Sequence, residues 1–253
     1  MATAAAPDLE NVSTVELLEE LKRRYACLAK PEGRYIFVGA PGSGKGTQSL
    51  FLKRSHCLCH LSTGDMLREA VAQGTEIGKL AKAKMDAGEL VSDDIMLKLI
   101  GEKVRSPRCR RGFILDGYPR NPSQAQSLEK LLTEARQKLD GVLYFDAPDN
   151  VLVDRVVDRL VHLPSGRVYN RKTKPPKVSG LDDVTGEPLV HRKDDNEAVL
   201  KKRLDIFRKE TMPVIEHYRK QGLLHTLDAA QDAETVTKEM YDFVGKHHKR
   251  FFS

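Results

Sequence analysis

The sequence predicts an α/β fold in which a five-stranded parallel sheet carries helices on both faces. Five short apolar runs, at residues 35–38, 57–61, 112–116, 141–146 and 223–227, alternate with segments of helical periodicity. Runs of four to six apolar residues are typical of strands buried on both faces, as in a parallel sheet. A chain of 253 residues is long enough for one large domain with small inserts.

The composition is that of a globular protein. Hydrophobic residues make up 40% and charged residues 31% of the chain, and no apolar run approaches the roughly 20 residues that cross a bilayer. The formal net charge is +6 and the pI is about 9.0. Such a charge indicates a nucleic-acid partner, an ordinary basic surface or a cleft for phosphate groups, and the positions of the arginines decide among them.

The cysteines give no metal site. Cys27, Cys57, Cys59 and Cys109 are scattered along the chain. The stretch CLCH at 57–60 contains possible metal ligands, but no second Cys/His pair follows at ligand spacing, so a buried strand is favoured. This usage is typical of reduced thiols in the cytosol, and reduced thiols are our expectation.

Residues 1–32 are interpreted as an N-terminal extension. Val15, Leu18 and Leu21 predict a short amphipathic helix that packs on the core or belongs to a partly ordered tail. The segment lacks the apolar stretch of a secretory signal and, unlike a transit peptide, has several acidic residues before any arginine. We therefore expect a cytoplasmic protein, with a mitochondrial one as the alternative.

The stretch GAPGSGKGT, residues 39–47, follows an apolar run and is expected to open a helix at Lys45. That context is what a phosphate-binding P-loop requires. Glycines let backbone N–H groups surround phosphate oxygens, the helix dipole attracts the anion, and Lys45 would reach the β- and γ-phosphates. Gly46 stands where Ser or Thr is usual, so Thr47 is expected to supply the hydroxyl near Mg²⁺ or a phosphate.

A second phosphate site is predicted beside the P-loop. Asp116 ends the third apolar run, where a carboxylate can hold Mg²⁺ through water. Arg120 follows it closely, and Arg68 comes after the second run. Because ligands of open parallel sheets bind beyond the carboxyl ends of the strands, the two guanidinium groups are expected to hold a second phosphate group. This predicts a nucleoside monophosphate as the phosphoryl acceptor.

Seven stretches of the chain resemble the signature sequences of adenylate kinases of the long-lid type. They are GAPGSGKGT, HLSTGDMLRE, GELVSDD, FILDGYPRNPSQ, HLPSGRVY, KPPKVSGLDDVTGEPL and RKDDNEAVLKKRL, in family order. Glycine after the P-loop lysine is normal in this family, and the extension is similar to that of plant-type members. The resemblance implies the P-loop nucleoside monophosphate kinase fold over residues 33–253. The implied parts are a core (33–61, 92–157 and 196–253), an NMP-binding insert (62–91) and a lid (158–195).

The resemblance also implies an activity, the reversible reaction of Mg²⁺-ATP with AMP to give two ADP, in a monomer without nucleic-acid or membrane partners. The implied catalytic residues are Lys45, Arg120, Arg155, Arg159, Arg192 and Arg203. The implied ATP-binding residues are Gly42, Ser43, Gly44, Lys45, Gly46, Thr47, Arg155, Arg159, Val168, Tyr169 and Gln231. The implied AMP-binding residues are Thr63, Arg68, Glu89, Leu90, Val91, Gly117, Tyr118, Pro119, Arg120, Gln124, Arg192 and Arg203. Asp116 and Thr47 would hold the metal.

Four of the implied arginines are expected to meet at the transferring phosphoryl group when the lid closes. Arg155 and Arg159 are spaced for one helix face, and Arg155 is also expected to stack on the ATP adenine. Arg192 and Arg203 complete the set.

Other side chains near these arginines are given separate roles. Asp194 and Asp195 are expected to orient the arginines, and Lys201 and Lys202 to lie on a solvated helix face. Gln124 has an amide that can both donate to and accept from an adenine edge.

The lid is expected to hold no zinc. His162, Ser165, Asp182 and Thr185 have the paired spacing of a four-ligand zinc site, but none of them is cysteine. Hydroxyl groups are poor zinc ligands, so only two suitable groups of the four needed are present. We expect the four side chains to hydrogen-bond to one another and so join the two halves of the lid.

Several alternatives stay open at this point. UMP/CMP kinases have short lids, and a nucleotide sensor would be expected to lack some of the arginines. A nucleic-acid-binding P-loop ATPase would need a basic stripe or aromatic platforms, and aromatic residues make up only 6% of the chain, with no tryptophan. No N-K-x-D motif for guanine is present, which disfavours a GTPase switch, but ATP and GTP both remain possible as phosphoryl donors.

Overall fold

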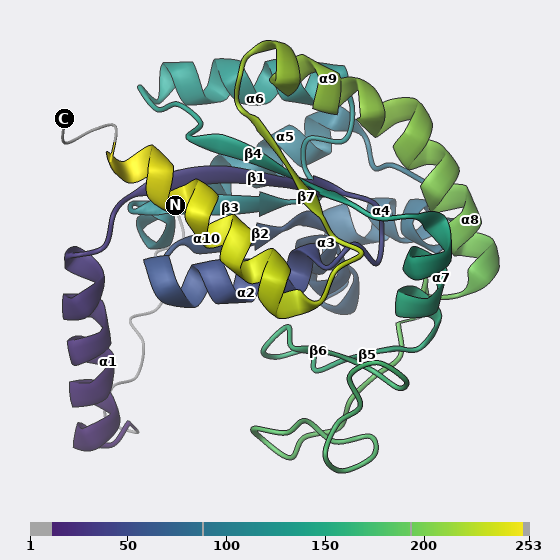
Figure 1. Ribbon diagram of the computed structural model, residues 1–253, viewed down its shortest axis with the longest axis horizontal. Coiled ribbons are helices and arrows are strands. Elements are labelled where there is room, and N and C mark those ends of the chain that lie inside the picture. Colours follow the sequence, from purple (N-terminus) through teal and green to yellow (C-terminus); the bar gives the residue numbers. More distant parts are fainter. Residues whose placement is uncertain (1–11, 88, 193, 250–253) are drawn as a thin grey trace.

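The computed structural model describes residues 12–87, 89–192 and 194–249, and it contains a parallel sheet between two layers of helices (Figure 1). The strands are β1 (Gly33–Gly39), β2 (Cys59–Ser62), β3 (Gly112–Asp116), β4 (Gly141–Asp146), β5 (Arg159–Val161), β6 (Val168–Asn170) and β7 (Leu224–Asp228). The α-helices are α1 (Thr14–Leu28), α2 (Lys45–His56), α3 (Thr63–Ala72), α4 (Glu76–Asp86), α5 (Asp93–Val104), α6 (Pro122–Glu134), α7 (Asp149–Val157), α8 (Glu197–Ile206), α9 (Met212–Lys220) and α10 (Ala233–Lys249). Two short turns of other helix types are η1 (Pro107–Cys109) and η2 (Phe207–Thr211).

The main sheet has five strands in the order β2-β3-β1-β4-β7, all parallel. Each of the five predicted apolar runs forms one of these strands. The run at 57–61 is shifted, because Cys57 caps α2 in a left-handed conformation and the strand begins at Cys59. The carboxyl ends of β1, β2 and β3 therefore lie at one edge, and the P-loop, α3 and the Asp116 loop all leave from it.

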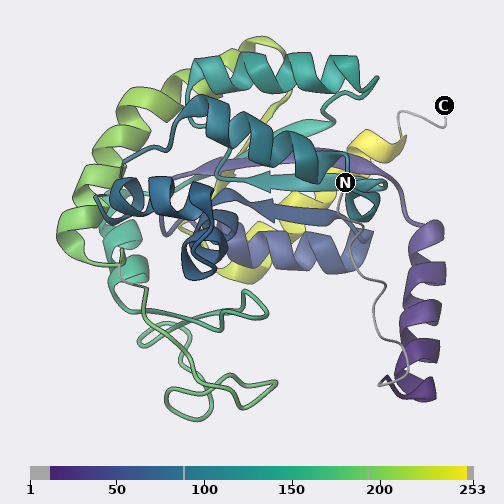
Figure 2. The same ribbon diagram turned by 180° about the vertical axis from the view of Figure 1, so that it is seen from behind.

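Alternate residues of the strands build two cores, one on each face of the sheet. On one face Ile36 and Val38 pack with α5, α6 and α9, and Figure 2 shows α5 and α6 from that side. On the other face Tyr35 and Phe37 pack with Leu52 of α2 and with α10. The two layers hold the sheet rigidly, and the loops at its carboxyl edge are left to form a site.

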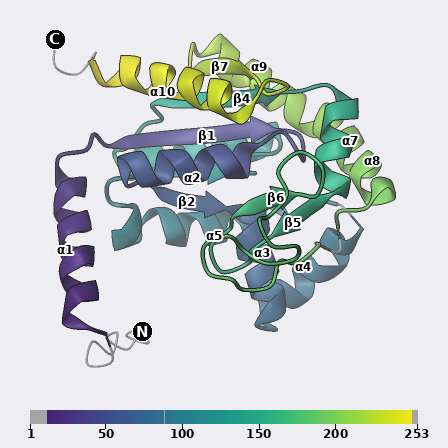
Figure 3. The same cartoon turned by 60° about the horizontal axis from the view of Figure 1, so that its bottom comes forward.

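The segment 158–195 lies apart from the main sheet. Strands β5 and β6 pair as an antiparallel hairpin. A single bridge, Val161–Val190, connects β5 to the later part of the segment, and a second, Leu181–Pro188, lies within that part. Figure 3 shows this hairpin at the carboxyl ends of the strands and α1 at the opposite end of the sheet. No described helix is long and apolar enough to span a membrane.

One of the two alternatives for the N-terminal extension, packing on the core, and the expectation of reduced cysteines are wrong. Helix α1 forms with a Ser13–Glu16 capping box, but its apolar side chains do not pack on the core, since Val15 and Leu21 are each 66% exposed. The cysteines are not reduced thiols either. They form two disulfides, Cys27–Cys57 and Cys59–Cys109.

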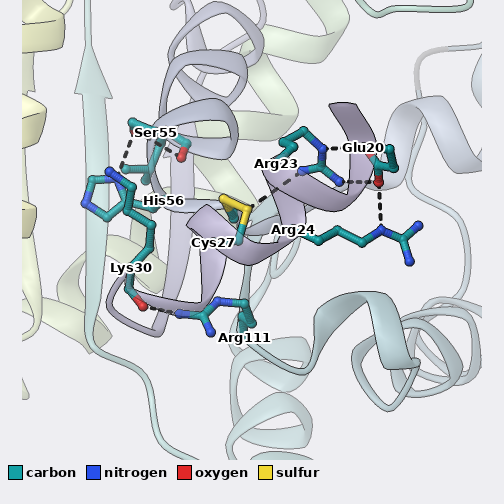
Figure 4. Close-up of a disulfide and its surroundings, with 10 residues drawn as sticks. Glu20, Arg23, Arg24, Cys27, Lys30, Ser55, His56 and Arg111 are labelled. Atoms are coloured by element: carbon teal, nitrogen blue, oxygen red, sulfur yellow. Dashed lines mark hydrogen bonds and ion pairs between the residues drawn. A yellow bond between two sulfur atoms is a disulfide. The ribbon is translucent and has the colours of Figure 1, made fainter. Parts of the chain in front are cut away.

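The first disulfide attaches α1 to the rest of the protein. Cys27, labelled in Figure 4, is the buried residue of this helix, and its disulfide partner Cys57 follows the last residue of α2. The Arg111 guanidinium adds a hydrogen bond to the carbonyl of Lys30 just beyond the helix. The sequence separation of 30 residues hides this pairing from any local reading of the chain.

Candidate active site

The P-loop connects β1 to α2, and the structure begins the helix at Lys45 as the sequence predicts. Gly42 and Gly44 have positive φ values of 87° and 89°, which side chains rarely adopt. A Cβ on Gly42 would also lie 2.8 Å from the carbonyl oxygen of Leu152 in α7, so this glycine permits a close packing. A Cβ on Gly46 would meet no protein atom within 4 Å, so protein packing does not require that glycine.

Lys45 and Asp116 are two buried groups of opposite charge at the end of the sheet. The Lys45 Nζ donates to the carbonyls of Gly39 (2.7 Å) and Ala40 (2.9 Å). Burial lowers the pKa of Lys45 to about 8, although the charge of Asp116 opposes this effect. Burial raises the pKa of Asp116, but the nearby His60 imidazole and the Lys45 charge outweigh it, so the pKa is lowered overall. Asp116 is therefore ionised at neutral pH.

Three carboxylates from two segments orient the arginines of the cleft. Asp65 Oδ1 of α3 accepts from Arg68 at 2.6 Å and from Arg192 at 2.8 Å. Asp194 Oδ2 accepts from Arg203 at 3.0 Å, and Asp195 accepts two hydrogen bonds from Arg159. The expected pairing of Asp194 and Asp195 with arginines is therefore present.

Mutual repulsion and burial make this arginine cluster an acceptor for anions. Burial lowers the pKa of Arg192 to about 10, and the charges of Arg68 and Arg159 act in the same direction. Burial also lowers the pKa of Arg203 to about 10. Positive charges held close together in a partly dry cleft gain more from an added phosphate group than solvated ones do.

Arg155 and Arg159 do not share a helix face, which corrects the sequence interpretation. Helix α7 ends at Val157, and Arg159 is the first residue of β5. Arg155 instead donates to carbonyls of the loop after β7, to Ala229 at 2.6 Å and to Gln231 at 3.4 Å. The chain turns between the two arginines, and they approach the cleft from different elements.

Gln124 is held on the acceptor side of the cleft. It is 2% exposed, and its Oε1 accepts from the backbone N–H of Arg120 at 2.7 Å. Its Nε2 donates to Asp93 at 2.8 Å. Gly117, in the loop between β3 and α6, has a positive φ of 80°, and a Cβ there would lie 3.0 Å from the Arg120 Nη2.

Most of these groups line one cleft of about 730 Å³ at the carboxyl edge of the sheet, while Asp93 and Asp195 lie outside its lining. The residues named from the sequence as catalytic, nucleotide-binding or metal-binding all belong to its lining. They come from the P-loop, α3, the segment before α5, the end of β3 and the loop after it, α6, α7, the lid segment, α8 and the loop after β7. The cleft contains the phosphate cradle and two further arginines, Arg68 and Arg120.

The comparisons with known proteins agree with this geometry. The family model for adenylate kinase matches residues 37–223. The chain belongs to the adenylate kinase family. It is 52% identical to adenylate kinase 4 of Oryza sativa subsp. japonica over 94% of this chain and 98% of that one. It is 51% identical to adenylate kinase 4 of Arabidopsis thaliana, covering 95% and 98% of the two chains. An adenylate kinase of Lodderomyces elongisporus is 44% identical over 91% and 94%.

The activity of this adenylate kinase family member is phosphoryl transfer from ATP to AMP, which gives two ADP. The sheet order and the flanking helices are consistent with the P-loop nucleoside monophosphate kinase fold. Two of the open alternatives are thereby removed, the nucleic-acid-dependent ATPase and the non-catalytic nucleotide sensor.

The lid of this adenylate kinase contains the hydrogen-bonded cluster that the spacing predicted. His162 Nδ1 lies 2.7 Å from Ser165 Oγ, and the Thr185 hydroxyl donates to Asp182 at 3.0 Å. The two pairs meet where Thr185 Oγ1 lies 3.4 Å from His162 Nε2. Three further residues also join the cluster: Arg167 and Glu187, which the sequence analysis did not name, and Tyr169, which it assigned to ATP binding. Whether the lid is free of zinc stays a prediction.

Sequence reasoning missed several partners of the site residues. His60 Nε2 lies 3.5 Å from Asp116 Oδ2, and Asp65 joins Arg68 to Arg192. Asp65 had a local signal, since a carboxylate three residues before an arginine on a helix is a common pair. Lys202 was assigned to a solvated helix face, but its Nζ binds Glu89 at 2.9 Å. That contact connects residues 113 positions apart and has no local signal.

Proposed function

We propose that the cleft binds the two nucleotides end to end, with their phosphates meeting between the P-loop and the arginine cluster. The ATP phosphates would lie on the P-loop, within reach of Lys45, and the AMP phosphate would lie between Arg68 and Arg120. The single observation that supports this most strongly is the position of Arg120. Its buried guanidinium projects into the cleft beside both Asp116 and the P-loop lysine.

The base of AMP is proposed to bind at Gln124. The amide of a glutamine can complement the N1 acceptor and the N6 donor of adenine. Gln124 is buried, it lines the cleft, and it lies in the first turn of α6, four positions after Arg120. Glu89, Leu90 and Val91 would form the other wall of this subsite.

The ATP base is proposed to bind near Arg155 and Gln231. The guanidinium of Arg155 is already fixed by the loop carbonyls of Ala229 and Gln231, so its flat face is held in one place on the cleft wall. A fixed guanidinium can stack on a purine without a further loss of side-chain freedom. Val168 and Tyr169 approach from the lid side of the cleft.

Mg²⁺ is proposed as the cofactor, since the residues present fit it. Asp116 is ionised, is only 13% exposed in its side chain, and shares the cleft lining with Thr47. Mg²⁺ at nucleotide sites is usually held by one or two carboxylates or hydroxyls, waters and phosphate oxygens. When bound, the ion would neutralise charge on the β- and γ-phosphates of ATP.

The catalytic work of the protein is proposed to be positioning and charge neutralisation. Phosphoryl transfer passes through a loose, anionic transition state, and positive groups around it lower the barrier. Lys45, Arg120, Arg159, Arg192 and Arg203 would surround the transferring group. Closure of the segment 158–195 would exclude water, which would otherwise accept the phosphoryl group.

A matrix of kinetic measurements tests these assignments. Turnover is measured for AMP, CMP, UMP and GMP, each with ATP and with GTP as the donor, for the wild type and Gln124→Ala. We expect ATP and AMP to be the preferred pair. In Gln124→Ala the preference for AMP over the other monophosphates should fall, because a lost hydrogen bond to the base costs about 1–3 kcal/mol. Equal losses for every base would remove Gln124 from base recognition.

The assembly state and the cellular compartment are also proposals. We propose a monomer, because both nucleotide subsites are formed within one chain, and light scattering coupled to size-exclusion chromatography tests this. We propose a cytoplasmic enzyme, because its ATP and AMP substrates are present there. Since disulfides are rare in the reducing cytosol, fractionation with thiol labelling of Cys27 and Cys57 is the deciding measurement.

A further inference from the structure

Polar groups of four residues near the AMP base subsite are joined in a closed ring of hydrogen bonds. The backbone N–H of Arg120 donates to Gln124 Oε1 at 2.7 Å, and Gln124 Nε2 donates to Asp93 Oδ1 at 2.8 Å. Asn121 Nδ2 donates to the same carboxylate, to Oδ1 at 3.1 Å and to Oδ2 at 3.3 Å. Asn121 Oδ1 accepts the backbone N–H of Gln124 at 2.8 Å, which closes the ring.

The directions of these bonds are fixed by groups that cannot reverse. A backbone N–H can only donate, so the oxygens of Asn121 and Gln124 must face the two backbone donors. The two amide nitrogens then face Asp93, and an ionised carboxylate can only accept. Turning the Gln124 amide over would oppose a donor to the Arg120 N–H and an acceptor to the Asp93 carboxylate. Both contacts would be lost at once.

An amide that cannot turn over distinguishes adenine from a 6-oxopurine. The Gln124 oxygen has a second lone pair and its nitrogen has a second hydrogen, so each can make one more bond. Adenine offers a donor at N6 and an acceptor at N1, while hypoxanthine offers the reverse, an acceptor at O6 and a donor at N1. A freely rotating glutamine amide would complement either edge. A fixed one complements one edge and opposes like groups to the other.

We propose that Asp93 is a specificity-determining positioning residue, whose carboxylate locks the Gln124 amide in the orientation that accepts AMP and rejects IMP or GMP. This rests on the proposed binding of the AMP base at Gln124. Asp93 does not belong to the cleft lining and acts through Gln124. It is the first residue of α5, while Gln124 lies in the first turn of α6, so the lock joins two helices on the same face of the sheet.

The test uses IMP, which differs from AMP at this edge of the purine. Initial rates of ADP and IDP formation with ATP are measured by chromatography for the wild type, Asp93→Leu and Asp93→Asn. Asp93→Leu should reduce the ratio of kcat/KM for AMP to that for IMP by about tenfold, because it removes one charge-assisted hydrogen bond that holds the amide. The loss should come mainly from a higher KM for AMP, with kcat at saturating AMP nearly unchanged.

Asp93→Asn separates hydrogen bonding from charge. Its amide oxygen can take the place of Oδ1, which accepts from both Gln124 and Asn121. This variant should therefore keep the AMP preference, although it lacks the negative charge just as Asp93→Leu does. Asp94→Leu is the matched control for a lost charge in the first turn of α5, since Asp94 is exposed. It should leave the ratio of kcat/KM for AMP to that for IMP at the wild-type value.

The outcomes distinguish a failure of the Asp93 lock from a failure of the base subsite at Gln124. If folded Asp93→Leu keeps the wild-type ratio while Gln124→Ala loses base preference, Gln124 reads the base and the Asp93 lock is wrong. If Gln124→Ala also keeps its base preference, the proposed base subsite is wrong, and the proposed role of Asp93 is wrong as well. Circular dichroism and thermal melts establish that each variant is folded before its kinetics are compared.

Discussion

Arg159 and Asp195 join the two ends of the lid segment by an ion pair with two hydrogen bonds. Arg159 is the first residue of β5, and Asp195 lies just before α8, 36 positions further on. Arg159 Nε donates to Asp195 Oδ2 at 2.7 Å, and Nη2 donates to Oδ1. The Asp195 side chain has no exposed surface. The pair closes the base of the lid and directs an arginine assigned to the transferring phosphoryl group.

Asp195→Asn should lower both stability and turnover. The substitution keeps the shape but leaves the buried Arg159 without a counter-charge, which costs about 1–3 kcal/mol. kcat should fall more than KM rises for either nucleotide, because the pair positions a group needed in the transition state. Urea unfolding and steady-state kinetics measure the two effects. Asp205→Asn, at an exposed position of α8, is the control. An Asp195→Asn enzyme with wild-type kcat would contradict a positioning role for the pair.

Arg120→Ala should reduce turnover by about 10³ to 10⁵, the range found for arginines that stabilise phosphoryl transfer. Arg120 is held by a hydrogen bond from its Nε to the carbonyl of Gly117 at 2.7 Å, and burial lowers its pKa. Arg110→Ala removes an exposed arginine and should have little effect. The measurement is kcat/KM for AMP with purified, folded enzyme. A wild-type value in Arg120→Ala would show that the acceptor phosphate binds elsewhere.

The affinity for ATP should fall as the pH rises through about 8. The pKa of Lys45 is lowered to about 8 in the folded protein, from an ordinary value of 10.5, so the ligand-free enzyme loses this charge above that pH. For stability the sign is the opposite. The folded state holds the proton less tightly than the unfolded chain, so this group adds stability as the pH rises from about 8 to 10.5.

Titration calorimetry between pH 7 and 9.5 measures this effect. ATP phosphates favour the protonated lysine, so binding at pH 8.5 should take up protons from the buffer. Heats measured in buffers of different ionisation enthalpy give the number of protons. Lys45→Arg stays charged over this range and should show neither the uptake nor the loss of affinity. An ATP affinity that is constant from pH 7 to 9.5 in the wild type would rule out the low pKa.

The elements that the sequence predicted well are the strands that are buried on both faces of the sheet. Strands β1, β3 and β4 are buried on both faces, so their apolar runs appear directly in the sequence. Strands β5 and β6 are three residues each and form a hairpin outside the main sheet, which leaves almost no periodic signal. The end of α7 at Val157 was missed as well. The spacing of Arg155 and Arg159 is compatible with a longer helix, but the chain leaves the helix there to form the lid hairpin.

Long-range polar contacts could not be predicted from local patterns. The Asp93 carboxylate reaches Gln124 across 31 positions, and Cys27 reaches Cys57 across 30. Motif spacing named Gln124 itself because a glutamine in that stretch resembles the family pattern. Neither spacing nor periodicity shows which carboxylate or thiol the fold brings beside a given group, since sheet order and helix packing decide that.

Reduction of the Cys27–Cys57 disulfide should expose α1 to proteolysis. The apolar side chains of this helix are exposed, and Cys27 is its buried residue, so the disulfide is its main attachment. Tryptic cleavage between Lys22 and Lys30 should be faster with dithiothreitol or in Cys27→Ser. Turnover should change by less than about twofold, as for surface changes away from a site, because α1 lies at the opposite end of the sheet from the cleft.

The comparison of reduced wild type with Cys27→Ser isolates this disulfide from Cys59–Cys109. Dithiothreitol should accelerate cleavage of α1 in the wild type and add nothing in Cys27→Ser, which still has the second disulfide. Mass spectrometry of the first peptides released identifies the cleaved bonds. Equal cleavage rates with and without reductant would mean that contacts other than the disulfide hold the helix.

The last prediction is that polar contacts, without zinc, hold the lid together. Asp182 is buried and accepts from Arg167 at 2.7 and 2.6 Å, from Tyr169 at 2.9 Å and from Thr185. The hydrogen bond from Arg167 holds the pKa of Asp182 far below its usual range. Purified enzyme should contain no stoichiometric zinc, and a chelator should leave the Tm unchanged. One zinc per chain would overturn the prediction.

Two substitutions test whether the cluster acts as a unit. Asp182→Ala should loosen the lid more than Ser165→Ala, because Asp182 accepts several hydrogen bonds worth about 0.5–1.5 kcal/mol each, while the Ser165 hydroxyl mainly contacts His162. The double variant should lose less than the sum of the two, since His162 lies 3.9 Å from Asp182 and 2.7 Å from Ser165 and couples them. Hydrogen exchange of the lid amides measures each loss locally. Strictly additive losses would mean that the two halves of the lid are held independently, and the paired spacing in the sequence would then have no structural meaning.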